Sequence, residues 1–268
     1  MRRQVLIVSL LIGGVAVSAS AHDLFLKFNT YFLPPQARVT VGLLSGTFQT
    51  SENTIDRHRM QDVSLVTPTG RLHPPISDWR DEGQTTFLDF DTREPGTYIV
   101  GVALKPREIE LKAADFNAYL EHDGIPDILA ERRKNNQLHQ DARERYSKYA
   151  KAIFQVGEPR TGNFQTRLGY PVEIIPRQNP YALTVGQTIE FLCLKEGKPI
   201  ANQFVMAGWE TDGRLSPPLH TRSDSRGIAR VTLQAAGKWY VKFIHMTPVK
   251  DSRVNYESRW ATLTFEIR

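Results

Sequence analysis

Cysteine is almost absent from this chain, since Cys193 is the only cysteine among 268 residues. A single cysteine excludes an internal disulfide and any metal site built from paired cysteines. Cys193 lies in the apolar run 189–194, so we predict a buried strand residue there rather than a reactive thiol.

A strong charge of one sign is also missing. Lys and Arg total 34 against 29 for Asp and Glu, which gives a net charge of +5. This small excess gives no reason to expect nucleic acid as a partner. The sequence also has no Gly-x-Ser-x-Gly elbow and no glycine loop suited to holding a phosphate. We therefore predict that the protein is not an enzyme and has no catalytic residues.

Long apolar runs are scarce, and the one present lies at the start of the chain. Arg2 and Arg3 precede an uncharged apolar stretch over 5–17, and Ala19-x-Ala21 is a small-residue cleavage signal. A membrane helix needs about 20 apolar residues, so we predict a signal peptide over 1–21 instead. Ordinary secretion is favoured over twin-arginine export, because the arginine pair directly follows Met1. We expect a soluble mature protein that is periplasmic or secreted and has no membrane span.

Cleavage after Ala21 would make His22 the first residue of the mature chain. A terminal histidine offers a free α-amine and a ring nitrogen, which together can chelate one metal ion. Nitrogen donors of this kind favour transition metals. The alternative is that histidine lies there by chance, because signal peptidase recognises the residues before the cut.

Most of the remaining chain has the pattern of short β-strands separated by turns. Pro-Gly followed by the apolar stretch 97–102 is typical of a late strand in an immunoglobulin-like sandwich. The fold class we predict is mainly β, with two immunoglobulin-like β-sandwich domains over residues 22–160 and 168–268. The expected strands are 24–28, 38–44, 62–66, 86–90, 94–102, 172–175, 188–194, 203–209, 228–233, 238–245 and 261–267.

A helical insertion is expected at about 113–155, in or after the first sandwich. Phe116, Tyr119 and Leu120 share one helical face, and Pro126 is suited to the first position of a second helix. A third helix is predicted over 139–154, where apolar and aromatic residues recur at helical spacing. Its apolar stripe either packs against the sandwich or forms a docking surface for a partner.

A second histidine lies at the end of an apolar strand. Trp239, Val241 and Phe243 share one strand face, and His245 continues that row. His245 is therefore either a core residue whose ring nitrogens are hydrogen-bonded or a ligand reaching into a pocket. The other histidines have no spacing typical of zinc sites.

Several segments resemble a known family of secreted bacterial proteins. They include "AHDLFL", "RYSKYAKAIFQVG", "GKWYVKFIHM" and "YESRWATLTFEI", in this order along the chain. Together they resemble domain-of-unknown-function family 4198, which is similar to the NikM-type components of nickel and cobalt uptake systems. The resemblance implies that His22, its acidic neighbour Asp23 and the late His245 are metal ligands. NikM-type nickel binding uses a histidine at the second position, whereas cleavage here would place it first.

These features lead to one preferred hypothesis and two alternatives. The preferred hypothesis is a periplasmic metal-binding protein that supports uptake or handling of nickel, cobalt or copper. It would bind one divalent transition ion through His22, His245 and Asp23, and its partner would be a membrane metal-uptake transporter. The first alternative is a β-sandwich binding or scaffold module without a metal. The second is a copper oxidase with a histidine brace, which needs a terminal histidine and a second histidine.

Overall fold

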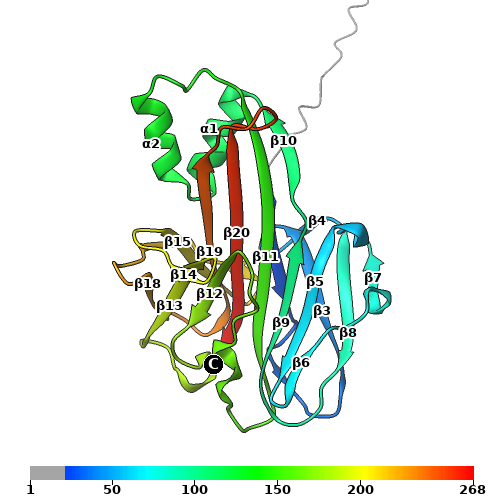
Figure 1. The fold of residues 1–268 in the computed structure, drawn as a ribbon. Helices are drawn as coiled ribbons and strands as arrows, with labels where there is room; N and C mark the ends of the chain where they lie inside the picture. The colour runs from blue at the N-terminus through cyan, green and yellow to red at the C-terminus, as the bar shows by residue number, and fades with distance from the viewer. Residues whose placement is uncertain (1–21) are drawn as a thin grey trace, which may run out of the picture.

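The fold is mainly β and consists of three sheets and a pair of helices (Figure 1). The computed structural model describes residues 22–268, so the predicted signal peptide and its cleavage site lie outside the described residues. The prediction of a mainly β, sandwich-like fold is confirmed.

An 11-stranded sheet runs through the whole molecule. Its main strand order is β16-β15-β19-β20-β11-β9-β5-β6, while β2, β10 and β17 pair at its margins. β11 and β20 run parallel, from the pair Glu144 and Tyr256 to the pair Ala152 and Thr264, and this pairing joins the two halves of the chain. The bounds are β2 Phe32–Leu33, β5 Met60–Thr67, β6 Gly70–Leu72, β9 Gly96–Leu104, β10 Arg107–Leu111, β11 Ala142–Val156, β15 Phe204–Thr211, β16 Arg214–Leu215, β17 Leu219–Arg222, β19 Gly237–Pro248 and β20 Tyr256–Ile267.

Two smaller sheets cover opposite faces of this central sheet. The first consists of β1 Asp23–Lys27, β3 Arg38–Gly46, β4 Ser51–Asn53, β7 Trp79–Glu82 and β8 Thr85–Asp91. The second consists of β12 Val172–Pro176, β13 Thr188–Lys195, β14 Lys198–Pro199 and β18 Ile228–Thr232.

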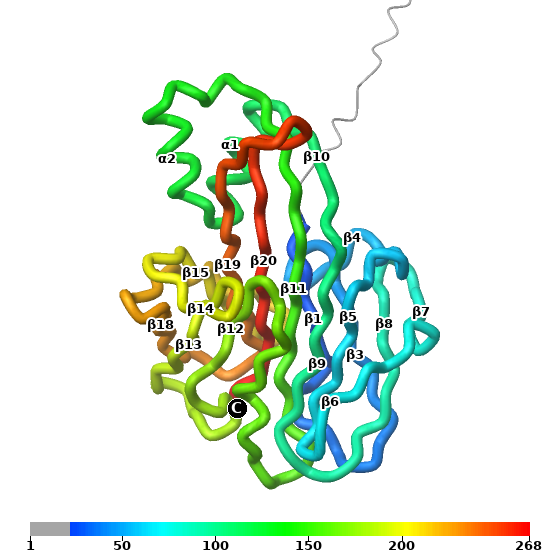
Figure 2. Tube along the Cα trace, in the orientation of Figure 1, coloured from blue at the N-terminus to red at the C-terminus, as the bar shows by residue number. Residues whose placement is uncertain are grey.

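The residues of β20 show which sheet covers which face. Thr262 and Thr264 donate hydroxyl hydrogen bonds to backbone carbonyls of β1, whereas Phe265 packs against Phe191 of β13. Successive strand residues point to opposite faces, so even-numbered residues of β20 face the β1 sheet and odd-numbered ones face the β13 sheet. The chain course is traced in Figure 2, where the first strand, in blue, lies next to β11.

Two helices lie between β10 and β11, at one end of the central sheet (Figure 1). They are α1 Ala113–His122 and α2 Pro126–Lys134, and the sequence predicted both. Phe116, Tyr119 and Leu120 of α1 are buried and pack with Trp260 of β20 and Met246 of β19. Because both strand residues are even-numbered, the helices cover the same face as the β1 sheet.

The predicted helix over 139–154 is wrong, because Ala142–Val156 forms the 15-residue strand β11. Ten consecutive residues of β11, from Ser147 to Val156, are buried, since a sheet covers each face of the strand. A strand buried on both faces shows no alternation between polar and apolar residues. Its tyrosines and alanines then matched helical spacing by coincidence.

The predicted division between 160 and 168 falls between β11 and β12, and each half contributes strands to the central sheet. Cys193 is buried on β13, as predicted, and burial raises the pKa of its thiol to about 12. Of the two helices described, neither combines the length and apolar character needed to cross a bilayer.

Candidate functional site around His22

His22 directly precedes β1 and lines a pocket of about 290 Å³. The pocket lies where the β1 sheet, the end of α1 and the central sheet meet. Its charged lining residues are Asp23, Glu52, Asp123 and Lys242. Carboxylates therefore outnumber ammonium groups, which favours a cationic occupant.

Glu52 approaches the His22 ring, with its Oε2 atom 3.3 Å from Nδ1. A bulge between Ser45 and Gly46 produces this approach, because the pairing of β3 with β4 skips Glu52. Gly46 is required there, since an added Cβ would lie 2.3 Å from the carbonyl oxygen of Thr50. Bulges commonly redirect a side chain in this way.

Behind His22, Lys242 of β19 forms a buried ionic cluster with two carboxylates. Its Nζ lies 2.6 Å from Asp23 Oδ2 and 3.1 Å from Asp123 Oδ1. Burial alone would lower the pKa of Lys242, but the two carboxylates outweigh burial and the net shift is upward. Burial raises the pKa of Asp123, and Lys242 offsets this only in part. Asp23 Oδ1 is buried and has no hydrogen-bond partner within residues 22–268.

Lys148 of β11 lies on the other side of His22 and donates a hydrogen bond to its backbone carbonyl oxygen. The ammonium group also lies over the rings of Tyr146 and Trp260, at 5.1 and 4.6 Å from their centroids. Burial is the main cause that lowers the pKa of Lys148 to about 8. Lys148 makes no salt bridge within the described part of the chain, so its charge is only partly compensated.

Glu144 is the other buried titratable group on this face of β11. Burial raises the pKa of Glu144 to about 7, although the carboxylate accepts hydrogen bonds from the hydroxyls of Tyr119 and Ser258. Its second oxygen, Oε2, has no hydrogen-bond partner among residues 22–268.

The structure brings His22 and Asp23 together but places His245 elsewhere. His245 is odd-numbered on β19, so it lies on the face covered by the β13 sheet, whereas Lys242 and the His22 pocket lie on the other face. Both ring nitrogens of His245 are engaged, Nε2 with Lys195 Nζ at 3.0 Å and Nδ1 with Gln203 Oε1 at 3.0 Å. Burial, with help from Lys195 and Arg259, lowers the pKa of His245 to about 4. These contacts match one of the two predictions for His245, a core residue whose ring nitrogens are hydrogen-bonded.

No three side chains of His, Cys, Asp or Glu converge as a ready metal site within residues 22–268. His22 and Glu52 supply two donors at one point, and the mature α-amine would add a third from His22 itself. Asp23 faces Lys242 and is an ion-pair partner in this arrangement rather than a ligand.

A comparison with family models identifies the protein's relatives. The model described as "Domain of unknown function (DUF4198)" matches residues 19–247. The chain belongs to this family. The matched range includes His22, Asp23 and His245, and the predicted family membership is confirmed. The similarity to NikM-type uptake components stays a prediction.

Searches for individual relatives of this DUF4198 protein add little. None of the curated proteins matches the chain. Among solved structures it is similar to Salmonella alpha-2-macroglobulin (10% identity, 91% of this chain and 15% of that chain, TM-score 0.26), the D0-D1 domain of intimin (14%, 91% and 97%, 0.22) and the human OSCAR ligand-binding domain (10%, 92% and 100%, 0.21). TM-scores this low support no inference about this chain.

Sequence reasoning missed Glu52, Asp123, Lys148 and Lys242. One of them carries a signal that could have been found, because Lys242 is a charged residue between apolar neighbours in β19. A lysine in such a strand is buried only with compensation, so it marks a polar cluster. Glu52 carries no such signal, since its position depends on the bulge.

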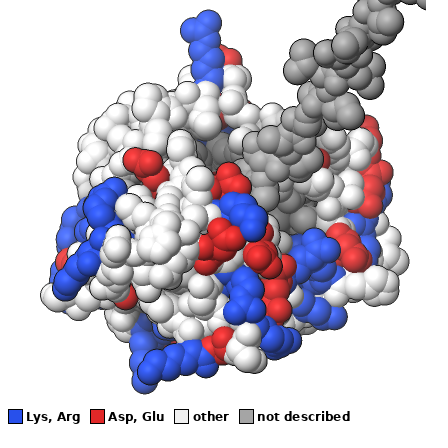
Figure 3. All heavy atoms as spheres, turned by 90° about the horizontal axis from the view of Figure 1, so that it is seen from above, with Lys and Arg blue, Asp and Glu red and all other residues white. Residues whose placement is uncertain are grey.

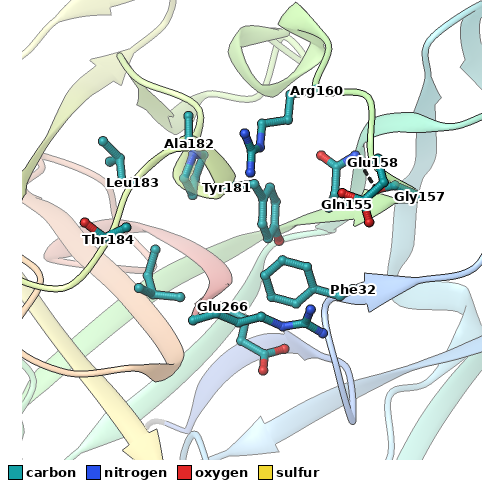
Figure 4. A pocket seen from close by; sticks show the side chains of 13 residues that line it. Phe32, Gln155, Gly157, Glu158, Arg160, Tyr181, Ala182, Leu183, Thr184 and Glu266 are labelled. Carbon is teal, nitrogen blue, oxygen red and sulfur yellow. Dashed lines mark hydrogen bonds between the residues drawn. The ribbon is translucent and has the colours of Figure 1, made fainter.

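A second cavity, of about 280 Å³, lies at the opposite end of the fold, near the last residues of β20 (Figure 4). Its aromatic wall is made by Phe32 and Tyr181, whose rings meet edge to face. Several of its polar groups have internal partners: Tyr181 donates its hydroxyl proton to the Ile153 carbonyl, and Glu266 accepts hydrogen bonds from Tyr31 N and the Thr30 hydroxyl. We therefore take the His22 end of the fold as the candidate site.

Proposed function

We propose that this DUF4198 protein is exported and binds one divalent transition metal ion at His22, in support of nickel, cobalt or copper uptake or handling. The observation that carries the proposal is the 3.3 Å approach of Glu52 Oε2 to His22 Nδ1. Nδ1 is the ring nitrogen that can close a six-membered chelate with the α-amine of the same residue. Glu52 therefore lies beside the nitrogen that a terminal chelate would use.

The donor set proposed here is the mature His22 amine, His22 Nδ1 and a Glu52 oxygen. A site with two nitrogen donors and one carboxylate binds divalent first-row metal ions in their general order of affinity. Copper should therefore bind more tightly than nickel, and nickel more tightly than cobalt. Asp23 and Asp123 lie behind this set and contribute negative charge without coordinating. The copper histidine brace has less support, because neither pocket that His22 lines contains a second histidine among the described residues.

Titration calorimetry of the secreted protein with Cu²⁺ tests the donor set. Glu52→Gln keeps the shape of the side chain and removes a charged donor, so we expect at least a tenfold weaker affinity, about 1.4 kcal/mol. One alanine added ahead of His22 moves the amine away and should weaken binding at least as much. His245→Gln is the matched control and should bind copper like the parent protein.

Two outcomes would contradict this assignment. If Glu52→Gln and the extended protein both bind copper like the parent, the donors lie elsewhere. If His245→Gln weakens binding as much as Glu52→Gln, the site depends on the other face of the central sheet.

The role in uptake needs a cellular test. A strain lacking the protein should accumulate less nickel, cobalt or copper under limitation, and the parent gene should restore accumulation. The Glu52→Gln gene should restore it only in part. Equal restoration by both genes would separate metal binding from any role in uptake.

A further inference from the structure

A further pocket, of about 440 Å³ and distinct from the cavity near the end of β20, adjoins His22 on the side away from Lys242. Three cationic side chains line it, Arg59, Arg107 and Lys148, against one carboxylate, Asp56. The pocket lies on the same face of β11 as the helices, between that strand, β10 and the segment after β4. We call it the basic pocket.

The cations of the basic pocket are not fully compensated by the protein. Lys148 is 7% exposed, and its hydrogen-bond acceptor in the described residues is the neutral carbonyl of His22. Asp23, Asp123 and Glu144 attract its charge, but none of them forms a salt bridge with it within residues 22–268. Arg59 Nε is buried and has no hydrogen-bond partner within residues 22–268. Its Nη2 donates to the Lys105 carbonyl at 3.3 Å, and its guanidinium lies 5.7 Å from the centroid of the Tyr146 ring. Asp56 accepts a hydrogen bond from the backbone N–H of His58, where it caps a short 3₁₀ turn.

Buried cations without anionic partners are costly, and a bound anion that pairs with them regains much of that free energy. Arginine forks are suited to carboxylates and phosphates, which they can hold through two parallel hydrogen bonds. The basic pocket therefore has the chemistry of an anion site.

The walls of the basic pocket distinguish between anions. Ile55, Ile109 and the ring of Tyr146 are apolar surfaces beside the cations. Small-molecule sites typically combine such apolar walls with a few charged groups in a volume of about 300–1,000 Å³. An inorganic phosphate would leave these walls uncovered, whereas the carbon chain of an organic acid would cover them.

We propose that the basic pocket binds a small organic polycarboxylate, whose carboxylates pair with Arg59, Arg107 and Lys148. On the described surface seen from above, acidic and basic side chains lie side by side (Figure 3). Specific pairing inside the pocket, rather than attraction to a broad basic surface, then determines binding. The proposal does not require a metal at His22, a residue that lines both pockets.

Citrate is the probe we would use, because it has up to three carboxylates and a short carbon chain. Calorimetry is performed on the secreted protein after treatment with chelating resin, so that no metal contributes. We expect saturable one-site binding that Lys148→Met and Arg107→Ala each weaken at least tenfold. Arg143→Ala is the matched control, since Arg143 is an exposed arginine of β11 on the opposite face, and it should leave citrate binding unchanged.

Inorganic phosphate and a folding check complete the experiment. Phosphate should bind at least tenfold more weakly than citrate, and equal binding would overturn the organic ligand. Absence of citrate binding, or equal losses in Arg107→Ala and Arg143→Ala, would overturn the site. Circular dichroism shows whether Lys148→Met is folded. If that variant does not fold, Arg107→Ala still tests the site, because Arg107 is exposed at the pocket rim. A metal site that fails in its own titration leaves this result unaffected.

Discussion

Lys148 and Lys151 are two buried lysines on the same strand, three residues apart and on opposite faces of β11. Lys151 pairs with Glu173 at 3.1 Å, and that carboxylate also accepts hydrogen bonds from the backbone N–H groups of residues 168, 169 and 170. Lys148 has a carbonyl and two aromatic rings but no salt bridge within residues 22–268. A buried charge that is fully paired organises the fold, whereas one left partly paired beside a cavity indicates a ligand.

Breaking the Lys151 pair should have the largest effect on stability. Glu173→Ala leaves the Lys151 ammonium uncompensated and frees the backbone N–H groups before β12, so we expect a loss of about 3–5 kcal/mol in the free energy of unfolding. Urea unfolding followed by fluorescence measures it. Replacing Lys151 by Met and Glu173 by Leu together should recover the part of the loss that comes from the uncompensated charge, while the backbone N–H groups of residues 168–170 stay without their acceptor. A double variant as unstable as Glu173→Ala would contradict this explanation.

Glu144 should make the free energy of unfolding decrease as the pH rises. Its folded pKa, about 7, lies above the unfolded value, so the folded state binds more protons between about pH 4.5 and 7. Its contribution to stability is complete below pH 4.5 and is lost as pH rises through 7, by up to about 3 kcal/mol. Urea unfolding from pH 4.5 to 8 should show a flatter profile for Glu144→Gln than for the parent. Parallel profiles would assign the pH dependence to other groups.

His245, on the other face of the central sheet, should have the opposite effect and make the free energy of unfolding decrease as the pH falls. Its folded pKa, about 4, lies below the unfolded value of about 6.5, so the unfolded state binds more protons between these values. Its contribution is complete above pH 6.5 and is lost as pH falls towards 4. Because the ring is only partly buried, solvent screening reduces the effect to about 1 kcal/mol. His245→Gln should remove this acid slope in urea unfolding, and an unchanged slope would show that the ring titrates normally.

Lys148→Met should have the smallest effect on stability. Methionine fills a similar volume and removes a desolvated charge that lacks a carboxylate partner, so the free energy of unfolding should change by no more than about 1 kcal/mol in either direction. Thermal and urea unfolding compare it with Lys151→Met, which should be clearly less stable. Similar losses in both variants would remove the distinction between a structural lysine and a ligand-pairing lysine.

The sequence was informative about strands with apolar runs and turn residues, such as β9, β13 and β19, and about both short helices. It was misleading for β11, whose two covered faces remove the polar alternation that identifies a strand. His22 and Asp23 could be named as candidates because their chemistry is local to the start of β1. Glu52 and Lys148 could not be found in this way, since a bulge brings Glu52 to His22, the packing of β1 against β11 brings Lys148 there, and neither residue has a local pattern. For His245 the sequence left both a core residue and a ligand open, because alternation along one strand does not reveal which sheet covers that face.

The parallel pairing of β11 with β20 also has a consequence for the order in which the chain can fold. Its two strands are separated in sequence by the whole of β12 to β19, and β20 ends at Ile267. During synthesis, the edge of β11 that pairs with β20 must therefore stay unpaired until β20 has been made. Contacts this distant in sequence are slow to form, and an open strand edge is prone to wrong pairing. We expect premature termination anywhere before β20 to release chains that aggregate instead of a folded first half.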